Sequence, residues 1–503
     1  MTTAHDLLAE PLLSWRNARY QRGTTTLPGL LAMLGKGELV DFPRVRAHQF
    51  HPWSMFLTQL AAIALKRADE NEPRLVEDAW RERLLALTDG AHEPWCLVVG
   101  DLAKAAFFQP PVAEGILTGW KEAATTPDDM DVLATAKAHD IKRSLVDPRD
   151  QEAWACALCC LQTMQGQYGA GQYGVARMNG GFATRVRVGV THAGRLHRTF
   201  IRDLELLLET WDDLVESRQY ANNGVTLVWN EPWDGRSSLE AEQLAPHFIE
   251  VCRRIRLTPS PQGIRCFTST STARRCLRAI KGGDVGDPWI PVDRDKATAL
   301  NIGGRGFGYA LTADLLFKNN FAPAAAQNLR PGDGDSIVMS LWGLARGQGG
   351  TEGLHERSVV LSGPVRRLLG QPDGRAVLGR RSSSAIQEAS DMRTKVLFPA
   401  LKQIALGGKV VNDQFDFRVD EIFFDTLFAA IEDDDDAARL HWKHTLKEVA
   451  WRELQSAIDR CSVPDARRYR AISDAERMFR GCLKKQFPDL FREEDDDGRG
   501  SKP

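Results

Sequence analysis

The sequence contains no run of about 18 apolar residues, so it predicts no membrane-spanning helix. Cysteine is scarce, with 9 among 503 residues, which excludes a disulfide scaffold. The first residues lack the basic start and apolar core of a secretory signal, and we therefore expect a cytoplasmic protein with reduced thiols. Hydrophobic residues at 43% and charged residues at 26% are typical of a globular chain of two or three domains.

Motifs for catalysis and metal binding are missing as well. The segment Gly303–Gly308 has Tyr309 where a dinucleotide-binding loop requires its third glycine. The only C-x-x-C, Cys156 and Cys159, lies in an apolar segment and has no second pair, which argues against a zinc site. Ser336 is a candidate hydrolase nucleophile without a companion Asp/His signature. We therefore expect no catalytic residue, no metal and no cofactor.

The formal net charge of −2 conceals two windows that contain basic residues and no acid. One runs from Arg177 to Arg202 and the other from Cys252 to Gly283. Their basic residues are Arg177, Arg185, Arg187, Arg195, Arg198, Arg202, Arg253, Arg254, Arg256, Arg265, Arg274, Arg275, Arg278 and Lys281. An acidic body with two basic windows is typical of a protein that binds a polyanion at a defined place. The alternative is that these arginines pair with acids elsewhere in the fold.

Hydrophobic periodicity predicts a mixed α/β region at 1–375. Its clearest elements are helices at 154–166 and 195–215, and strands at 225–229, 336–342 and 357–361. The glycine-rich stretch 343–353 between the last two strands predicts a flexible loop.

A change of composition near 370–384 indicates a domain boundary. Four helical segments follow, at 385–406, 419–431, 442–461 and 465–485. The fold class is therefore α+β, with the mixed α/β domain followed by a C-terminal four-helix bundle at 385–490. The last residues, 491–503, predict an acidic disordered tail.

Three segments together resemble a known family. Residues 176–185 read ARMNGGFATR, and residues 344–348 read LARGQ. A third motif near the N-terminus consists of Leu7, Leu8, Glu10 and Pro11. They resemble, in this order, the glycine loop, the glutamine-wedge loop and the N-terminal start of the large subunit (CasA) of type I-E Cascade, the CRISPR RNA-guided surveillance complex. The family's Trp-Ile-Pro after the start is missing. The paired cysteines of some members are missing too, so the resemblance implies no zinc.

The resemblance implies that the glycine loop, with Arg177, Asn179, Gly180 and Gly181, reads a short protospacer-adjacent motif in duplex DNA. Glycines let a backbone approach a base-pair edge, and an asparagine amide suits the degenerate pattern of the minor groove. Gln348, supported by Gly347, would act as a wedge that starts strand opening, at a cost of a few kcal/mol of unstacking per step.

The remaining site residues are basic. We expect Arg185, Arg274 and Arg275 to contact DNA phosphates, and Lys281 to be a basic finger with Arg278 as the alternative. The resemblance implies that a loop with Lys142 and Arg143 faces the guide RNA.

Together these features predict a non-catalytic subunit of an interference complex. The expected partners are guide RNA, double-stranded target DNA, the other Cascade subunits and a helicase-nuclease effector. Two alternatives stay open at this point. One is another RNA- or single-strand-binding protein with a basic groove, and the other is a hydrolase that uses Ser336.

Overall fold

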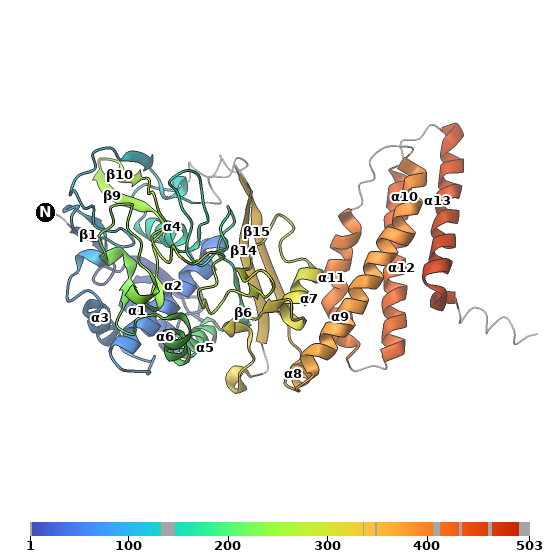
Figure 1. Cartoon of the computed structure of the whole chain (residues 1–503), viewed down its shortest axis with the longest axis horizontal. Helices are drawn as coiled ribbons and strands as arrows, with labels where there is room; N and C mark the ends of the chain where they lie inside the picture. The colour runs from blue at the N-terminus through green and yellow to red at the C-terminus, as the bar shows by residue number, and fades with distance from the viewer. Residues whose placement is uncertain are drawn as a thin grey trace, which may run out of the picture. The chain divides into compact units, whose positions relative to one another are not determined.

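The computed structural model describes residues 3–131, 146–334, 337–347, 350–405, 413–431, 435–460 and 465–491. Within it the chain divides into two compact units (Figure 1). The N-terminal unit comprises Met1–Phe307 and Asn320–Val360, and the C-terminal unit comprises Gly308–Asn319 and Leu361–Pro503. The division at 360/361 precedes the boundary expected near 370–384, and a short internal segment joins the C-terminal unit. Of the expected acidic tail, 491–503, only Phe491 is described, and it ends a short helical turn, Pro488–Phe491.

The N-terminal unit contains helices on several small sheets. Its helices are α1 (Leu27–Lys36), α2 (Ala47–Arg67), α3 (Glu77–Ala86), α4 (Gln151–Met164), α5 (Leu196–Glu209) and α6 (Trp211–Arg218). Its strands are β1 (Thr3–Asp6), β2 (Leu13–Arg16), β3 (Arg22–Thr25), β4 (Cys96–Val99), β5 (Lys121–Ala124), β6 (Arg187–His192), β7 (Val225–Leu227), β8 (Leu244–Ile249), β9 (Arg254–Ser260), β10 (Gly263–Ser269), β11 (Val292–Asp293), β12 (Thr298–Ala299), β13 (Phe321–Ala322), β14 (Ile337–Gly347) and β15 (Gly350–Val360).

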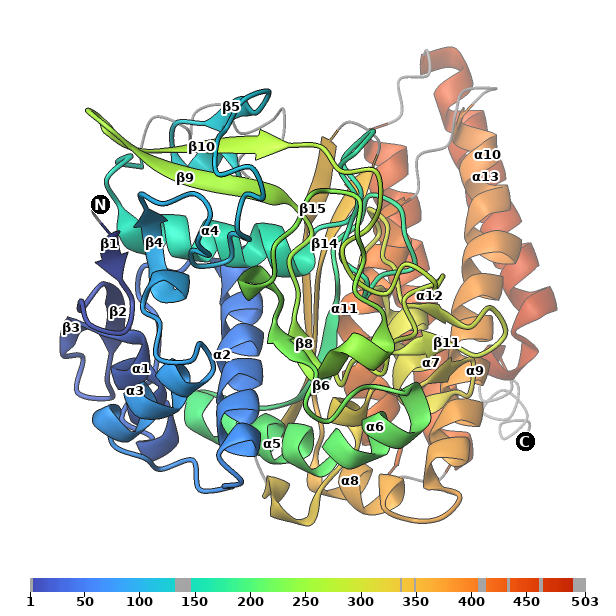
Figure 2. The ribbon, with the colours of Figure 1, turned by 60° about the vertical axis from the view of Figure 1, so that its left-hand side comes forward.

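These strands form three-stranded sheets in the orders β5-β10-β9, β12-β11-β13 and β15-β14-β6, and pairs β1-β4, β2-β3 and β7-β8. Helix α2 runs through the unit and packs against α4, α5 and β8 (Figure 2). Its apolar residues are spaced to face several neighbours at once, so Trp53, Phe56 and Leu60 are at most 1% exposed. The core of the unit therefore lies around α2.

The amphipathic segment expected at 195–215 forms two helices instead of one. Helix α5 ends at Glu209 and α6 begins at Trp211. Between them the Thr210 hydroxyl donates to the carbonyl of Leu206 at 2.8 Å, a bond that competes with the helical backbone and bends helices. The hydroxyl also contacts Nε2 of His247 at 3.2 Å, which fixes the break against β8.

The glycine-rich stretch 343–353 is a hairpin rather than the flexible loop expected from its composition. Strands β14 and β15 pair from Val338↔Val360 to Gly347↔Gly350, with one shift of register between Ala345 and Arg346 (Figure 1). Gly343 allows a close contact, because a Cβ there would lie 2.7 Å from Cδ1 of Ile302 and that side chain would have to shift. The glycines thus permit close packing along a strand, and residues 348–349 at the tip lie outside the described residues.

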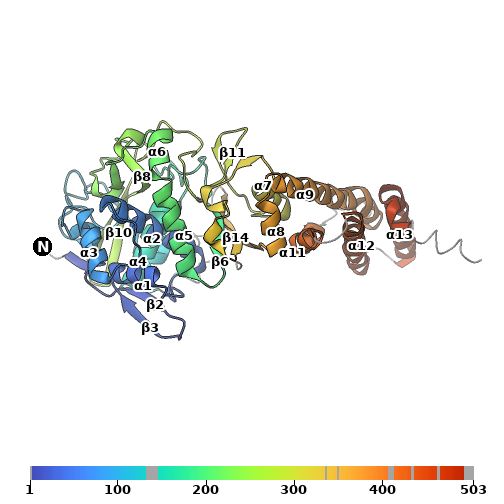
Figure 3. The ribbon, with the colours of Figure 1, turned by 90° about the horizontal axis from the view of Figure 1, so that it is seen from below.

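The C-terminal unit is helical, as expected from the sequence. Its helices are α7 (Tyr309–Phe317), α8 (Gly363–Leu369), α9 (Gly374–Asp391), α10 (Phe398–Ala405), α11 (Asp413–Ala429), α12 (Asp435–Asp459) and α13 (Asp465–Gln486). A π-helical segment, Met392–Leu397, connects α9 to α10, so the two form one long helix. This helix packs against α11, α12 and α13 (Figure 3), which confirms the four long helices of the predicted bundle.

Candidate nucleic-acid interface

Most arginines of the two acid-free windows lie in the protein interior. Arg177, Arg185, Arg187, Arg202, Arg253, Arg256 and Arg275 are each at most 4% exposed. In the first window they pair with carboxylates outside it, namely Asp203, which directly follows the window, and the distant Glu250, Asp287 and Asp333. This is the alternative that the sequence left open. In the second window they donate to backbone carbonyls: Arg256, for example, bonds Lys104, Val99 and Asp101. Most arginines of the two windows therefore stabilise the fold instead of forming a basic surface.

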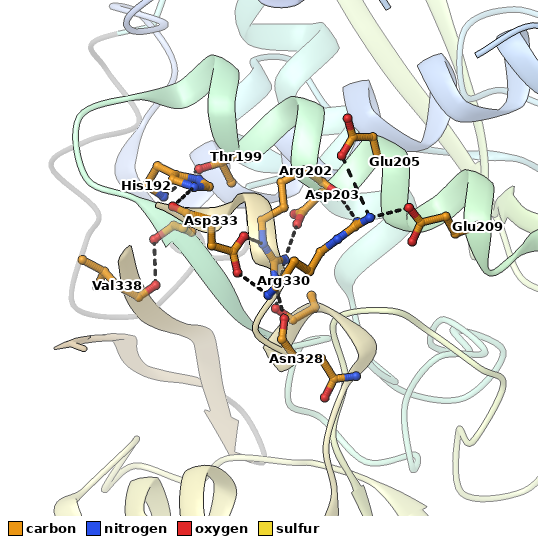
Figure 4. A network of polar contacts seen from close by, with 12 residues as sticks. His192, Thr199, Arg202, Asp203, Glu205, Glu209, Asn328, Arg330, Asp333 and Val338 are labelled. Carbon is orange, nitrogen blue, oxygen red and sulfur yellow. Dashed lines mark hydrogen bonds and ion pairs between the residues drawn. The ribbon is translucent and has the colours of Figure 1, made fainter. Parts of the chain in front are cut away.

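Arg202 illustrates this structural use (Figure 4). Its Nε donates to Oδ1 of Asp333 at 2.6 Å, and its Nη2 donates to the carbonyl of Asn328 at 2.5 Å. Arg330 bonds the Arg202 carbonyl at 3.2 Å and pairs with Glu209. These contacts fasten α5 to the segment before β14 and occupy the Arg202 guanidinium inside the protein.

The glycine loop, residues 177–182, is fastened at both ends by one buried carboxylate. Oδ2 of Asp287 lies 3.1 Å from Nε of Arg177 and 2.5 Å from Nη2 of Arg185. Glu250 adds a second anchor, since it accepts from Nη1 of Arg177 and from the Ala176 amide, both at 2.7 Å. Burial lowers the pKa of Arg185, and the Asp287 charge opposes that shift. Arg177 and Arg185 thus hold the glycine loop in position from the protein interior.

The glycine loop exposes backbone at its two central glycines. Gly180 and Gly181 have φ of 88° and 81°, values that favour glycine. No heavy atom of the described residues lies within 4 Å of a Cβ built on Gly180, so its backbone faces open space. Asn179 is half-buried, and its Oδ1 accepts from Nδ2 of Asn301 at 3.4 Å. A flat surface, such as a base-pair edge, could approach this backbone closely.

The segment that contains Lys281 packs directly against the glycine loop. A Cβ on Gly283 would lie 2.3 Å from the carbonyl carbon of Met178, so only glycine fits at this contact. Lys281 and Arg278 are exposed. Arg274 is half-buried and donates to the carbonyl of Ile280 at 3.4 Å.

The prediction that Arg185 and Arg275 contact DNA phosphates does not agree with their burial. Arg275 and Arg185 are each 2% exposed. Arg275 donates to the carbonyls of Glu231 and Pro232, and Arg185 pairs with Asp287. Guanidiniums held in this way are not free to reach DNA, so phosphate contacts stay a prediction only for Arg274, Arg278 and Lys281.

The β14–β15 hairpin leaves the sheet beside the glycine loop. The Thr184 hydroxyl and the Leu344 amide lie 3.0 Å apart, and the Thr184 amide donates to the Leu344 carbonyl at 3.2 Å. Because β6 and β14 are antiparallel, the loop before β6 and the tip after β14 emerge at the same end of the sheet. Gly347 is the last described residue before that tip. The expected wedge Gln348, the RNA-facing Lys142 and Arg143, and Ser336 all lie outside the described residues.

Sequence reasoning missed one pair of residues between these loops. Tyr168 is 61% exposed, and the Arg346 guanidinium lies over its ring, 5.0 Å from the centroid. The local duplication Gln167–Gly174, in which Gln-Tyr-Gly occurs twice, is the signal that could have pointed to Tyr168. No feature of the sequence pointed to Arg346, because it meets Tyr168 only in the folded chain.

Within the described parts of the chain, no cluster of His, Cys, Asp or Glu side chains could hold a metal ion. No helix in those parts is long and apolar enough to cross a membrane. The candidate site consists of exposed glycine backbone, a neighbouring basic segment and the described end of the β14–β15 hairpin, all within the mixed α/β unit. The chain also has a helical C-terminal unit. This combination defines an α+β class of protein in which a mixed α/β unit is joined to a helical unit.

Comparisons identify that class with a known fold. No protein-family model and no curated protein matches the sequence. Among solved structures, Cse1 from Acidimicrobium ferrooxidans matches with a TM-score of 0.62 at 17% identity, over 96% of this chain and 98% of that chain. Cse1 from Thermobifida fusca matches with a TM-score of 0.63 at 13% identity, over 97% and 98% of the two chains. A chain of a CRISPR RNA-guided surveillance complex matches with a TM-score of 0.54 at 15% identity, over 96% and 100%.

The chain therefore has the Cse1 (CasA) fold along nearly its whole length. The resemblance seen in the loop sequences is confirmed at the level of the fold.

Proposed function

We propose that this chain is the non-catalytic large subunit of an RNA-guided CRISPR interference complex. It recognises a protospacer-adjacent motif in duplex DNA, starts strand opening and helps to recruit the helicase-nuclease effector. Its partners are the guide RNA, the target DNA and the other subunits of the complex.

The observation that carries the proposal is the exposed glycine loop in a chain with the Cse1 fold. A Cβ built on Gly180 meets open space and Gly181 is exposed, while the exposed Lys281 lies on the segment packed against the loop. Backbone and amide groups read the minor groove with tolerance, and a nearby cation offsets phosphate charge. This arrangement supports recognition of a short and degenerate motif.

Strand exchange between DNA and guide RNA is nearly balanced in free energy, so small protein contributions at the first base pairs decide whether opening starts. The tip that follows Gly347 is the element that would make this contribution, since β14 is bonded through Leu344 to Thr184 in the segment that leads from the glycine loop to β6. It supports the assignment of Gln348, four residues after Leu344, as the wedge.

The test is motif discrimination by the assembled complex with Gly180→Asp. The variant places a side chain and a negative charge against the DNA, so we expect the ratio of affinities for targets with and without the motif to fall to about one. Gly90→Asp is the matched control. Gly90 also has a positive φ, 80°, and open space around its Cβ, but it lies far from the loop in the sequence. Normal discrimination by Gly180→Asp would remove the assignment.

A second measurement separates the proposal from a general single-strand-binding protein. As a large subunit, the chain needs guide RNA and partner subunits for tight binding to duplex DNA. Tight binding by the chain alone, unchanged on addition of the other components, would favour the general binding protein.

A further inference from the structure

A cavity of about 250 Å³ lies between the end of α4, the segment that follows it and the β5-β10-β9 sheet, and Arg346 of β14 also lines it. Tyr168, Gln172, Arg346 and Arg253 contribute polar groups, and Met130 and Ile255 contribute apolar surface. Its volume is below the roughly 300–1,000 Å³ of pockets for drug-sized ligands. It is therefore suited to a smaller planar group with polar edges.

Two guanidiniums of the cavity, those of Arg253 and Arg346, form no ion pair with any carboxylate of the described residues. Arg253 donates to the carbonyls of Gly166 and Cys252 at 2.7 and 3.2 Å. Burial and the Arg253 charge lower the pKa of Arg346, with Tyr168 opposing them. An anion placed here would supply the missing countercharge.

One acid, Asp129, also lines the cavity, but its carboxylate is already engaged. It accepts from the backbone amides of Thr125 and Thr126 at 3.0 and 3.1 Å and closes a short turn there. The excess charge of the cavity is therefore positive.

Tyr168 gives the cavity an aromatic platform. Its ring is largely exposed although Arg346 covers part of it, and an exposed tyrosine ring is a general surface on which nucleobases stack. The backbone holds the ring in place, since the Tyr168 amide donates to Gln172 at 3.0 Å and the Gln167 amide donates to Gly181 at 2.8 Å. The platform is thus attached to the glycine loop itself.

We propose that this cavity binds one unpaired nucleotide of single-stranded DNA, with its base stacked on Tyr168 and its phosphate at Arg346. The lining residues favour this ligand, because Tyr168 lies in the segment hydrogen-bonded to the glycine loop and Arg346 lies over its ring from β14. A DNA strand separated beside the glycine loop would therefore meet an aromatic ring and a cation. Arg346 precedes the expected wedge Gln348 by two residues. The proposal rests on the proposed function. It adds a binding site for a separated nucleotide, which keeps the DNA open after the wedge has entered.

The first test measures binding of a fluorescein-labelled five-nucleotide DNA to the full chain. Tyr168→Ala should weaken it about ten-fold, while Tyr168→Phe retains the ring and the affinity. Tyr20→Ala is the matched control, because Tyr20 is 80% exposed and also lies beneath an arginine, Arg16, at 5.9 Å. Equal affinity of wild type and Tyr168→Ala, or an equal loss in Tyr20→Ala, would overturn the proposal.

The second test uses the assembled complex with 2-aminopurine at successive DNA positions beside the motif. At one position the fluorescence should be quenched by stacking in the wild type and in Tyr168→Phe, and bright in Tyr168→Ala. The same fluorescence in all three proteins at every DNA position would reject the site, as would a difference seen only with the probe in the guide RNA. Gly180→Asp is measured alongside, so a failure of the proposed function is recognised separately.

Discussion

Arg177 and Asp287 form a buried ion pair beneath the glycine loop, with Nε and Oδ2 3.1 Å apart and both side chains at most 4% exposed. The pair connects the start of the loop to the segment that follows Lys281. Since Asp287 also pairs with Arg185 after the loop, one carboxylate sets the spacing of its two ends.

Replacing this carboxylate should cost stability, because two buried guanidiniums lose a countercharge. For Asp287→Asn we expect a loss of about 3–5 kcal/mol in the free energy of unfolding, measured by urea denaturation. The control is Glu122→Gln, which breaks the half-exposed pair with Arg265 and should cost at most about 1 kcal/mol. Equal costs for the two variants would show that the buried pair contributes no more than a surface pair.

The buried arginines show why the site could be predicted only in part. A window without acids indicates excess charge along the sequence, but the partners of Arg177 and Arg185 come from Glu250 and Asp287, far away in the chain. Sequence alone cannot tell such an arginine from an exposed one. Gly180 and Gly181 could be predicted from the resemblance of residues 176–185 to a known glycine loop, and both have the positive φ that glycine favours. That they read a DNA motif stays a prediction.

The fold, too, could be predicted from the sequence only in part. The four long C-terminal helices could be predicted, because a buried stripe such as Leu446, Ala450 and Leu454 has helical spacing. The hairpin through 343–353 could not, since glycine composition alone indicates a loop. There the pairing of β14 with β15 and β6 makes the structure, and β6 lies about 150 residues earlier in the sequence.

The exposed basic residues beside the loop should carry the salt dependence of DNA binding. Charge reversal in Arg278→Glu with Lys281→Glu leaves up to two phosphates without a neutralising cation. The slope of log K against log salt should therefore become shallower by about 0.9 for each of these phosphates. Lys36→Glu, at an exposed position at the end of α1, is the control and should leave the slope unchanged. An unchanged slope in the double variant would show that Arg278 and Lys281 are surface residues that contact no DNA phosphate.

Acid should destabilise the N-terminal unit through His247. Burial, reinforced by the Arg177 charge, lowers the pKa of His247 from 6.5 to about 4. Between these values the unfolded chain binds a proton that the folded chain does not, so stability falls as the pH falls. The maximal contribution is about 3 kcal/mol.

The measurement is urea unfolding at several pH values from 7 to 4 for the wild type and His247→Asn. Asparagine tolerates the positive φ of 56° at this position. The difference between the two proteins cancels the titration of other groups and should shrink as the pH falls. A difference that stays constant across this range would show that His247 does not set the pH dependence.

The last prediction separates docking from opening. If Gln348 is the wedge, its work begins after the duplex has docked on phosphates and the glycine loop, so Gln348→Ala should spare most of the initial binding. It should slow guide–target pairing, because no side chain replaces the stacking that disappears when the first base pair opens. The measurement is the pairing rate in the assembled complex on an intact duplex and on one with the first target base pairs mismatched into a bubble.

The bubble supplies the cost of unstacking in advance, so it should rescue Gln348→Ala and accelerate the wild type much less. Thr351→Ala, on β15 just beyond the tip, tests whether any change in the hairpin has the same effect and should behave like the wild type. If Gln348→Ala is equally slow on the intact and the bubbled duplex, the step it impairs is not strand opening, and the tip of the hairpin is a turn without a wedge.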